Sequence, residues 1–396
     1  MNSTSIRQAV ILAGGQGMRL RPITNTIPKP MVPIQGKPFL EHLVMLLRPQ
    51  GISEVIMLLG YLPEKIQEYF GDGNRWGVSI QYSIGSVEDE TGTRIRNARP
   101  FLDNRFLMLY CDNYWPAFNL SAMLKTHEES ESLATLTVYT NRVPITRNNL
   151  EIGPDNLVKR YDRSRREEGL NAVDAGFFIL ERSCLNELPD HNFSFEDEVI
   201  PALIKQNKLG VFKTDHRYYS IGSIERLPIA EKFFQPRKIL FLDRDGVINR
   251  KAEKGSYIRN WSEFEFLPGA VDALVKLSQL NYEFYLISNQ AGIARGQMTR
   301  KDAENIHERL EQELGRNGVK INGIYFCPHA WDRGCGCRKP EPGMLFQAAS
   351  EHAIDFRRAV FVGDDPRDEK AGLSVGCRTI MVSPQRGLAE ALSQLS

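Results

Sequence analysis

The chain has 396 residues, of which 42% are hydrophobic and 25% are charged. Its 50 Lys and Arg residues balance 49 Asp and Glu residues, so the formal net charge of +1 gives no sign of a nucleic-acid or membrane-surface partner. A chain of this length is too long for one ordinary core, and we expect two domains.

The first residues of the chain do not resemble a targeting or membrane segment. Residues 1–8 lack a basic stretch followed by a long apolar run, and apolar runs such as 55–59 are far too short to span a membrane. We therefore predict a cytoplasmic protein without a membrane partner. The six cysteines agree with a reducing compartment, because three of them crowd near one histidine, which favours metal binding over disulfides.

Residues 9 to about 230 alternate short apolar runs with amphipathic stretches. The apolar runs have the composition of strands, and the stretches between them have helical spacing. Such alternation predicts a doubly wound, mostly parallel α/β sheet. The strand-like runs fall at residues 10–12, 55–59, 78–82, 106–110 and 133–138.

A second alternating series begins at Ile239. Between the two series lies a short join, residues 231–237, which contains a single proline, Pro236. We therefore predict two doubly wound α/β domains, at residues 1–235 and 236–396. The strand-like runs of the second series begin at Ile239 and continue at residues 284–287, 323–326, 359–362 and 379–382.

The first strand-like run leads into a glycine-rich loop at residues 13–22. Gly14, Gly15 and Gly17 let backbone N–H groups approach a polyphosphate, and Arg19 adds positive charge for its oxygens. A glycine turn alone is weak evidence, since many such turns need glycine only for backbone shape. The next segment is more specific, because prolines on both sides of Lys29 stiffen the loop that holds its ammonium group.

These motifs resemble the sugar-1-phosphate nucleotidyltransferases over residues 9 to about 230. Residues 14–20, 28–34 and 36–38 nearly reproduce the family's G-G-x-G-T-R-L, P-K-P-M-x-P-I and G-K-P motifs. The resemblance implies a Rossmann-like domain that transfers a nucleotidyl group from a nucleoside triphosphate to a sugar 1-phosphate and releases pyrophosphate.

The resemblance also implies roles for individual residues of the first domain. The glycine loop, Arg19 and Gly92 would bind the nucleotide, Lys29 would neutralise the reacting phosphate, and Asp112 would take Mg²⁺. Residues 173–176 and Glu196 resemble the family's sugar pocket, although a strand edge and a helix cap explain them nearly as well.

Several positions depart from the family pattern. Met18 stands in place of a threonine, the L-G-T-A-G-A motif has become residues 90–95, and Arg163 replaces a lysine. The D-I-G-T motif begins with Ser220, so the second metal-binding aspartate is absent, and a hydroxyl is a poor substitute for a carboxylate on Mg²⁺. Two alternatives stay open: an active transferase with altered metal handling, or a domain that binds sugar phosphate or nucleotide with little or no turnover.

The second domain opens with a pair of carboxylates. Asp243 and Asp245 follow the apolar run 238–242, at the end of a strand where open α/β sheets bind ligands. One can attack a phosphorus centre while the other handles protons, and together they can seat a hard divalent cation. When such a pair occurs alone, the two acids commonly mark only the loop that follows a strand and have no catalytic role.

Three further strand ends carry polar residues that complete a site. Ser288 and Asn289 can donate hydrogen bonds to phosphate oxygens, and Lys339 can balance the charge of the nucleophile and the phosphoryl group. A second group of acids begins at Asp364, at the end of a third strand-like run. Together these elements are hard to produce by chance.

The set resembles the haloacid-dehalogenase phosphatases over residues 239 to about 385, in the branch of heptose-bisphosphate and histidinol-phosphate phosphatases. The resemblance implies that Asp243 is the nucleophile, which forms an aspartyl-phosphate, and that Asp245 is the general acid and base. Mg²⁺ would be held by Asp243, the backbone carbonyl of Asp245, and Asp364. The phosphoryl group would be bound by Ser288, Asn289, Arg338 and Lys339, while Asp365 and Asp368 are weaker metal-ligand candidates.

A cysteine-rich loop precedes the catalytic lysine. Cys327, His329, Cys335 and Cys337 offer three thiolates and one imidazole, a complete tetrahedral set for structural Zn²⁺. Because Cys337 directly precedes Arg338 and Lys339, the metal would fix the loop that carries two phosphate-binding cations. The same zinc loop occurs in the phosphatase branch that the domain resembles.

Joining the two domains suggests successive reactions. Removing the 7-phosphate of a heptose 1,7-bisphosphate leaves a heptose 1-phosphate, the kind of acceptor the first domain would need, and we expect GTP as the nucleotide by family analogy. Alternatives are a monofunctional phosphatase, acting on this substrate or on histidinol phosphate, and a non-enzymatic sensor in which both domains bind ligands. The partners are sugar phosphates and nucleotides, with a homo-oligomer left open.

Overall fold

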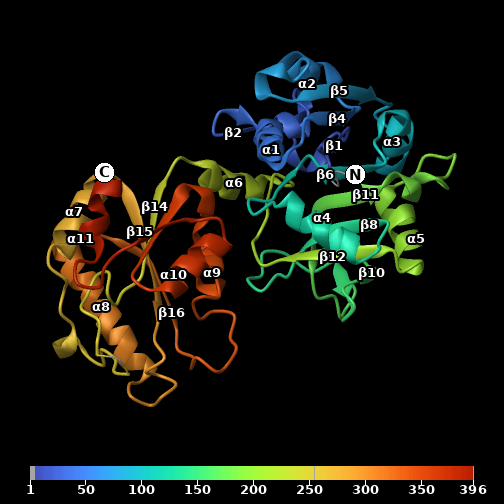
Figure 1. Ribbon diagram of the computed structural model, residues 1–396. Coiled ribbons are helices and arrows are strands. Elements are labelled where there is room, and N and C mark those ends of the chain that lie inside the picture. The colour runs from blue at the N-terminus through green and yellow to red at the C-terminus, as the bar shows by residue number, and fades with distance from the viewer. Residues whose placement is uncertain (1–4, 254, 396) are drawn as a thin grey trace. The chain divides into compact units, whose positions relative to one another are not determined.

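The computed structural model describes residues 5–253 and 255–395. The chain divides into two compact units, Met1–Phe234 and Gln235–Ser396, and each has its own sheet with helices on its faces (Figure 1). The predicted doubly wound α/β class is confirmed for both units. Within the described residues no helix is long and apolar enough to cross a membrane.

The first unit contains a seven-stranded sheet with the order β12-β8-β11-β6-β1-β4-β5. Its pairs are parallel except for those that β11 makes with β6 and β8. All six residues of β1 are buried, and its continuous apolar run is typical of parallel strands that are covered on both faces. The strands are β1 (Gln8–Ala13), β4 (Glu54–Leu59), β5 (Ser79–Ile84), β6 (Arg105–Tyr110), β8 (Ala134–Tyr139), β11 (Val173–Glu181) and β12 (Leu209–Thr214).

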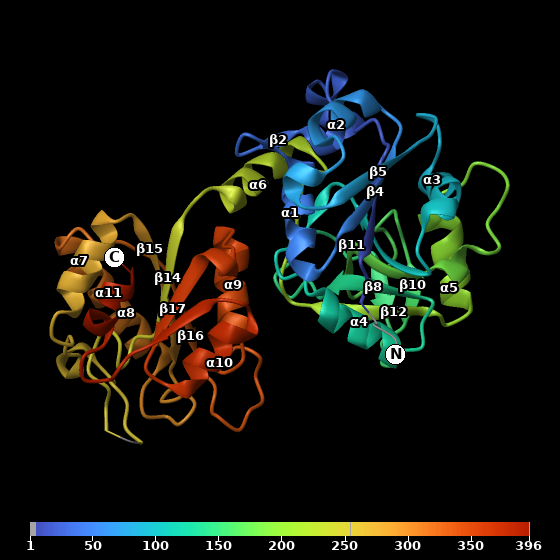
Figure 2. The same cartoon turned by 45° about the horizontal axis from the view of Figure 1, so that its top comes forward.

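Three two-stranded ribbons and six α-helices surround this sheet. The ribbons pair β2 (Pro33–Ile34) with β3 (Lys37–Pro38), β7 (Asn113–Tyr114) with β13 (Tyr219–Ser220), and β9 (Leu150–Ile152) with β10 (Val158–Tyr161). The helices are α1 (Phe39–Leu47), α2 (Pro63–Phe70), α3 (Thr91–Ala98), α4 (Leu120–Glu129), α5 (Ile200–Lys205) and α6 (Leu227–Phe234). Figure 2 shows α1 and α3 on opposite faces of the sheet. One core lies under α3 and α5, where Ile95 and Leu203 pack on side chains such as Leu12 of β1.

The second unit has a five-stranded, wholly parallel sheet with the order β16-β15-β14-β17-β18. β14 lies at its centre, so the acids that follow it are flanked by the ends of two neighbouring strands. The strands are β14 (Lys238–Leu242), β15 (Tyr282–Asn289), β16 (Ile321–Cys327), β17 (Ala359–Gly363) and β18 (Arg378–Met381).

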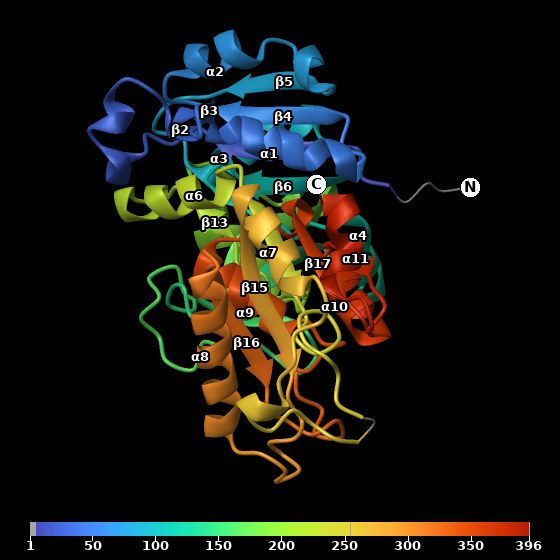
Figure 3. The ribbon, with the colours of Figure 1, turned by 90° about the vertical axis from the view of Figure 1, so that its left-hand side faces the viewer.

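Alternate residues of these strands enter two separate cores. Leu240 and Leu286 pack against α7 (Ala270–Gln279), α8 (Arg300–Arg316) and α11 (Leu388–Leu395). Phe241 and Ile287 pack against α9 (Gly343–His352) and α10 (Pro366–Ser374) on the other face. Figure 3 shows α7 and α8 on the face of the sheet that is turned toward the viewer. This two-sided burial explains why the strands are continuous apolar runs in the sequence.

Candidate active sites

A cavity of about 680 Å³ lies in the first unit at the carboxyl ends of β1 and β6. The two strands are parallel neighbours, so the glycine loop after β1 and Asp112 after β6 meet at one edge of the sheet. Gly92 does not line the cavity: a Cβ there would lie 2.2 Å from the Phe193 ring, so glycine is needed for packing. The predicted residues that do line the cavity are Gly14, Gly15, Gly17, Arg19, Lys29, Asp112, Arg163, Asp174 and Glu196.

Asp112 forms an ion pair with Lys29 in this cavity. Burial opposes ionisation of Asp112, but Lys29, Arg19 and Arg226 together hold its pKa below the usual range. The carboxylate is therefore ionised at neutral pH and already faces cationic side chains. Lys29 therefore lines the cavity as the ion-pair partner of Asp112.

Ser220 lies beside Asp112, as the resemblance predicts for the second metal-binding position. β13 pairs with β7, which directly follows Asp112, and the N–H of Ile221 donates to the Asp112 carbonyl oxygen over 3.0 Å. The Ser220 hydroxyl accepts a hydrogen bond from the Gly222 N–H at 3.0 Å. Asp112 is thus left without a second carboxylate at this position, and the donor set does not fit a metal held by two aspartates.

The opposite wall of the cavity carries two buried carboxyl groups. Glu196 accepts hydrogen bonds from Tyr110 and, at 2.6 Å, from Thr91. Asp174 accepts from the Gly176 N–H at 2.6 Å and from Tyr161 at 3.2 Å, and burial raises its pKa to about 7. Such groups can accept hydrogen bonds from the hydroxyls of a sugar.

In the second unit, Lys339 lies between two carboxylates at the end of β14. Its Nζ is 3.0 Å from Asp243 Oδ1 and 2.7 Å from Asp368 Oδ1, and it donates to the Ile287 carbonyl oxygen at 2.6 Å. Only 2% of Lys339 is exposed. Burial opposes its charge, but Asp243 and Asp368 raise its pKa, so the ammonium is fixed as a cation against the predicted nucleophile.

Asp364 completes a group of three carboxylates with Asp243 and Asp368. One ligand oxygen from each lies within 4.8 Å of the others. Asp364 Oδ2 pairs with Lys251 at 2.6 Å, whereas its buried Oδ1 has no hydrogen-bond partner in the described part of the chain. An unsatisfied carboxylate oxygen beside two further carboxylates is a donor set that fits Mg²⁺. The structure thus brings Asp368, a weaker candidate from the sequence, into the group.

Asp245 points away from this group into a hydrogen-bond network of its own. Arg244 Nη2 lies 3.0 Å from both of its carboxylate oxygens, and Asn249 and Gln290 donate to it at 2.9 and 3.0 Å. Burial opposes ionisation, but Arg244 and these donors hold the pKa of Asp245 below its usual range. The carboxylate is therefore held in one place beside the nucleophile.

The four predicted phosphate-binding residues of this unit differ in their contacts and their burial. Asn289 uses both halves of its amide on the Lys339 backbone, at 3.1 Å each, so it positions the lysine directly. Ser288 is buried and accepts a hydrogen bond from Gln290 at 2.8 Å. Arg338, half-buried, lines a second cavity of about 410 Å³ together with Lys339, Glu341, Arg367 and Trp331, whose side chain is exposed.

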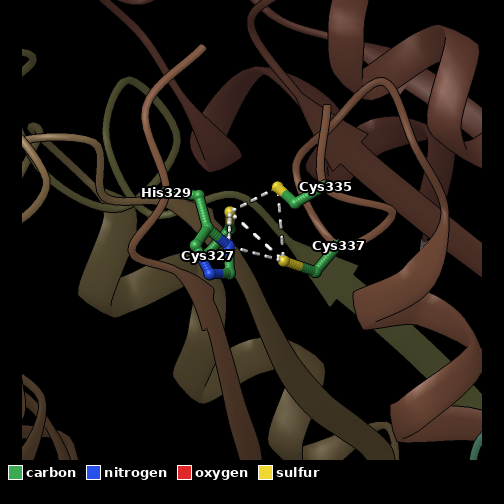
Figure 4. A group of neighbouring side chains, drawn as sticks. All are labelled: Cys327, His329, Cys335 and Cys337. Carbon is green, nitrogen blue, oxygen red and sulfur yellow. Dashed lines mark hydrogen bonds between the residues drawn. The ribbon is translucent and has the colours of Figure 1, made fainter. Parts of the chain in front are cut away.

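The four predicted zinc ligands converge in one cluster (Figure 4). The Cys337 sulfur lies 3.4 Å from Cys327 and 3.6 Å from Cys335, and His329 Nδ1 lies 3.2 and 3.5 Å from the sulfurs of Cys337 and Cys327. A tetrahedral Zn²⁺ with bonds of about 2.3 Å to sulfur would space these atoms about 3.5 to 3.8 Å apart. The cluster therefore has the atoms and nearly the spacing that zinc requires.

The first unit matches known proteins along nearly its whole length. Residues 8–234 match the family model described as Nucleotidyl transferase. The solved structure of HddC from Yersinia pseudotuberculosis complexed with GMP-PN is 27% identical, with a TM-score of 0.50, and the match covers 58% of this chain and all of HddC.

Other relatives are phosphatases. Residues 336–394 match the family model described as HAD-hydrolase-like. The D-glycero-beta-D-manno-heptose-1,7-bisphosphate 7-phosphatase of Pseudomonas putida is 40% identical over 150 residues, 38% of this chain and 85% of the relative. The corresponding alpha-heptose phosphatase of Mycobacterium tuberculosis is 46% identical over 130 residues, 33% of this chain and 68% of the relative. The chain belongs to both families.

These matches confirm that the chain joins a sugar-phosphate nucleotidyltransferase to a phosphatase. The sequence interpretation missed several residues of the two sites, among them Arg244, Gln290 and Arg94. Arg244 stands between the two acids of the phosphatase motif and Gln290 follows Ser288 and Asn289, so their positions in the motifs were the available signal. Arg94 of the nucleotidyltransferase unit was visible only as part of a segment that departs from the family pattern.

Proposed function

We propose that the chain is a bifunctional enzyme of nucleotide-activated heptose synthesis. The phosphatase unit would remove the 7-phosphate of D-glycero-D-manno-heptose 1,7-bisphosphate, and the nucleotidyltransferase unit would transfer a guanylyl group to the heptose 1-phosphate that remains. The observation that carries the proposal is the carboxylate–lysine–carboxylate arrangement of Asp243, Lys339 and Asp368 in a chain whose relatives are heptose-bisphosphate phosphatases.

The residues of the phosphatase unit support a two-step hydrolysis. Asp243 would attack the 7-phosphoryl group and form an aspartyl-phosphate, while Lys339 balances the negative charge of the nucleophile and the ester. The anionic ester, bound beside Asp245, would raise the pKa of this carboxyl so that it takes up a proton, which it would pass to the departing sugar oxygen. Asp245 would then take a proton from the water that attacks the phosphorus of the aspartyl-phosphate and releases inorganic phosphate from Asp243. Asp243, Asp364 and the backbone carbonyl of Asp245 would hold Mg²⁺, which adds further charge neutralisation at the phosphoryl group.

The 410 Å³ cavity beside Lys339 offers a place for the sugar. Trp331 is 70% exposed there and can lie against the apolar face of a sugar ring, and the Glu341 carboxylate can accept hydrogen bonds from its hydroxyls. Arg338 supplies a cation for phosphate. Zn²⁺ on the cysteine cluster would brace the loop that carries Trp331 and Arg338.

The nucleotidyltransferase unit would act on the product of the phosphatase unit. The glycine loop, Arg19 and Lys29 would neutralise the triphosphate and the sugar phosphate, and Asp174 and Glu196 would orient the sugar. The choice of GTP is supported by the relative HddC, whose structure contains GMP-PN. The relatives include phosphatases of both the beta- and the alpha-heptose bisphosphate, so both anomers of heptose 1-phosphate are tested as acceptors.

The direct test is ³¹P NMR of the full chain with heptose 1,7-bisphosphate, Mg²⁺ and GTP. We expect loss of the 7-phosphate resonance, release of inorganic phosphate, and then the paired signals of a nucleotide-sugar diphosphate together with pyrophosphate. Asp243→Asn should stop the first change while supplied heptose 1-phosphate still yields the nucleotide sugar. Release of phosphate with no nucleotide sugar from any of the four common NTPs would reject the second activity.

One observation favours a second candidate, a monofunctional phosphatase. Ser220 leaves Asp112 without the second metal-binding carboxylate. In that case the first unit would bind GTP or heptose 1-phosphate without turnover, which calorimetry can measure. To separate the two substrate alternatives, kcat/KM for phosphate release is measured with histidinol phosphate and with heptose bisphosphate.

A further inference from the structure

Arg94 is a buried cation beneath the glycine loop of the nucleotidyltransferase unit. It lies on α3, directly after the retained Gly92-Thr93 pair, in the segment that departs from the family's L-G-T-A-G-A motif. Only 5% of the residue is exposed, and it lines the 680 Å³ cavity. Across the described residues it has no carboxylate at ion-pair distance.

The Arg94 guanidinium donates to backbone carbonyls at three strand ends. It reaches the Leu59 oxygen at the end of β4 at 2.7 Å, the Ser86 oxygen after β5 at 2.7 Å, and the Gly14 oxygen after β1 at 3.4 Å. A further hydrogen bond of 3.3 Å goes to the Val87 carbonyl oxygen. One side chain thus ties the glycine loop to the two loops beside it.

The glycine loop is shaped around this guanidinium. A Cβ on Gly14 would lie 2.3 Å from Arg94 Cζ, and a Cβ on Gly60 would lie 2.5 Å from its Nη atoms. Glycine at both positions therefore lets the guanidinium occupy the space directly under the loop. The absence of a side chain at the motif glycine Gly14 therefore makes room for Arg94, and it also lets a phosphate approach the backbone.

The charge of Arg94 is only weakly compensated within the protein. Burial lowers its pKa, and Asp89 opposes this shift without forming an ion pair. Arginine nevertheless stays protonated at neutral pH. A buried cation that lines a cavity is stabilised when an anion binds in that cavity.

We propose that Arg94 is a positioning residue for the nucleoside triphosphate. It holds the glycine loop in its phosphate-binding shape and adds positive charge beneath the phosphates, in a site that lacks the second metal-binding carboxylate. The inference rests on the proposed nucleotidyl transfer and adds to it a residue at a position where this chain departs from the family motif.

The test compares Arg94→Gln, Arg94→Lys and the control Arg96→Gln in the full chain. Arg96 is on the same helix and also donates to backbone carbonyls, those of Pro189 and His191, but it does not line the cavity. Calorimetry with GTP and Mg²⁺ should show binding weakened about 10- to 100-fold by Arg94→Gln, the effect of losing charge-assisted hydrogen bonds. Arg94→Lys should lose less, and Arg96→Gln should match wild type.

Two further measurements separate positioning from general destabilisation. Heptose 1-phosphate, which binds toward Asp174 and Glu196, should keep its affinity within about twofold in Arg94→Gln, while KM for GTP rises more than kcat falls. Amide hydrogen exchange at Gly15 and Gly17 should become faster in this variant without nucleotide. If Arg94→Gln does not fold, the affinities for GTP and for heptose 1-phosphate are compared in Arg94→Lys, which keeps the charge.

Unchanged GTP affinity in Arg94→Gln, or an equal loss of GTP and heptose 1-phosphate binding, would overturn the proposal. Failure of the proposed guanylyl transfer looks different, because it is seen in wild type. If wild-type protein prefers another NTP, the Arg94 comparison is made with that nucleotide. If wild type binds no NTP, both the transferase activity and the role of Arg94 are rejected.

Discussion

The two sites of this chain handle charge in opposite ways. In the phosphatase unit, buried charges are paired: Lys339 lies between Asp243 and Asp368, and Arg244 holds Asp245. In the nucleotidyltransferase unit, Asp112 faces the cations Lys29, Arg19 and Arg226, and Arg94 is buried without an ion pair to any described residue. We therefore expect the first site to be organised before substrate binds, and the second to gain negative charge from an anionic ligand.

This difference predicts how each site responds to the loss of one group. A paired site fails when one partner is removed, because the other charge is left buried and uncompensated. A cationic site loses affinity in steps, since each cation contributes separately to binding a polyphosphate. Four further experiments test this contrast, and their expected effects decrease in order.

The largest effect is expected from Asp243→Asn. The variant lacks the nucleophile, so phosphate release from heptose bisphosphate should fall by at least about 10³-fold. Nucleotidyl transfer to supplied heptose 1-phosphate should be unchanged in the same protein. Phosphate release within about tenfold of wild type would contradict the assignment of the nucleophile.

Loss of the zinc cluster should have the next largest effect. Cys337→Ser removes one thiolate next to Arg338 and Lys339, and we expect phosphatase activity to fall about 10- to 100-fold. Bound zinc, measured by atomic emission, should fall from about one per chain, the content of one tetrahedral site. Cys377→Ser, a buried cysteine outside the cluster, is the matched control, and equal effects of the two variants would reject a metal role.

Trp331→Ala tests the place of the sugar. Losing an aromatic contact of about 1 kcal/mol or more should lower kcat/KM for heptose bisphosphate about tenfold. Hydrolysis of acetyl phosphate, which has no ring, should be unaffected. Leu373→Ala, which changes another exposed apolar residue of this unit, is the control. Equal losses on both substrates would point to a damaged zinc loop instead.

The smallest effect is expected from Ser220→Asp. The substitution places a second carboxylate beside Asp112, and we expect the Mg²⁺ concentration for half-maximal nucleotidyl transfer to fall severalfold. The added acid also partly neutralises the cations of the cavity, so GTP binding without Mg²⁺ should weaken. Unaltered Mg²⁺ dependence would show that residue 220 has no part in metal handling.

Much of this organisation could be predicted from the motifs. Acids and cations at strand ends indicated both sites, because parallel strands bring their carboxyl ends to one edge of a sheet. Only the start of β11, residues 173–176, was considered as a strand edge, and its antiparallel direction could not be predicted, because a buried run does not reveal the direction of its strand. The pairing of Asp368 with Lys339 could not be predicted, because sequence spacing does not show that the first turn of α10 lies beside Lys339.

Residue chemistry and local spacing determined the two α/β units, the candidate nucleophile and acid pair, and the four candidate zinc ligands, because each depends on neighbours close in the sequence. The tertiary structure alone decided which charges meet. Arg94 reaches three loops from separate strands, Asn289 holds the backbone of Lys339, and Gly92 serves packing against Phe193. These contacts join residues 8 to 101 positions apart, and only the packed sheet sets their distances.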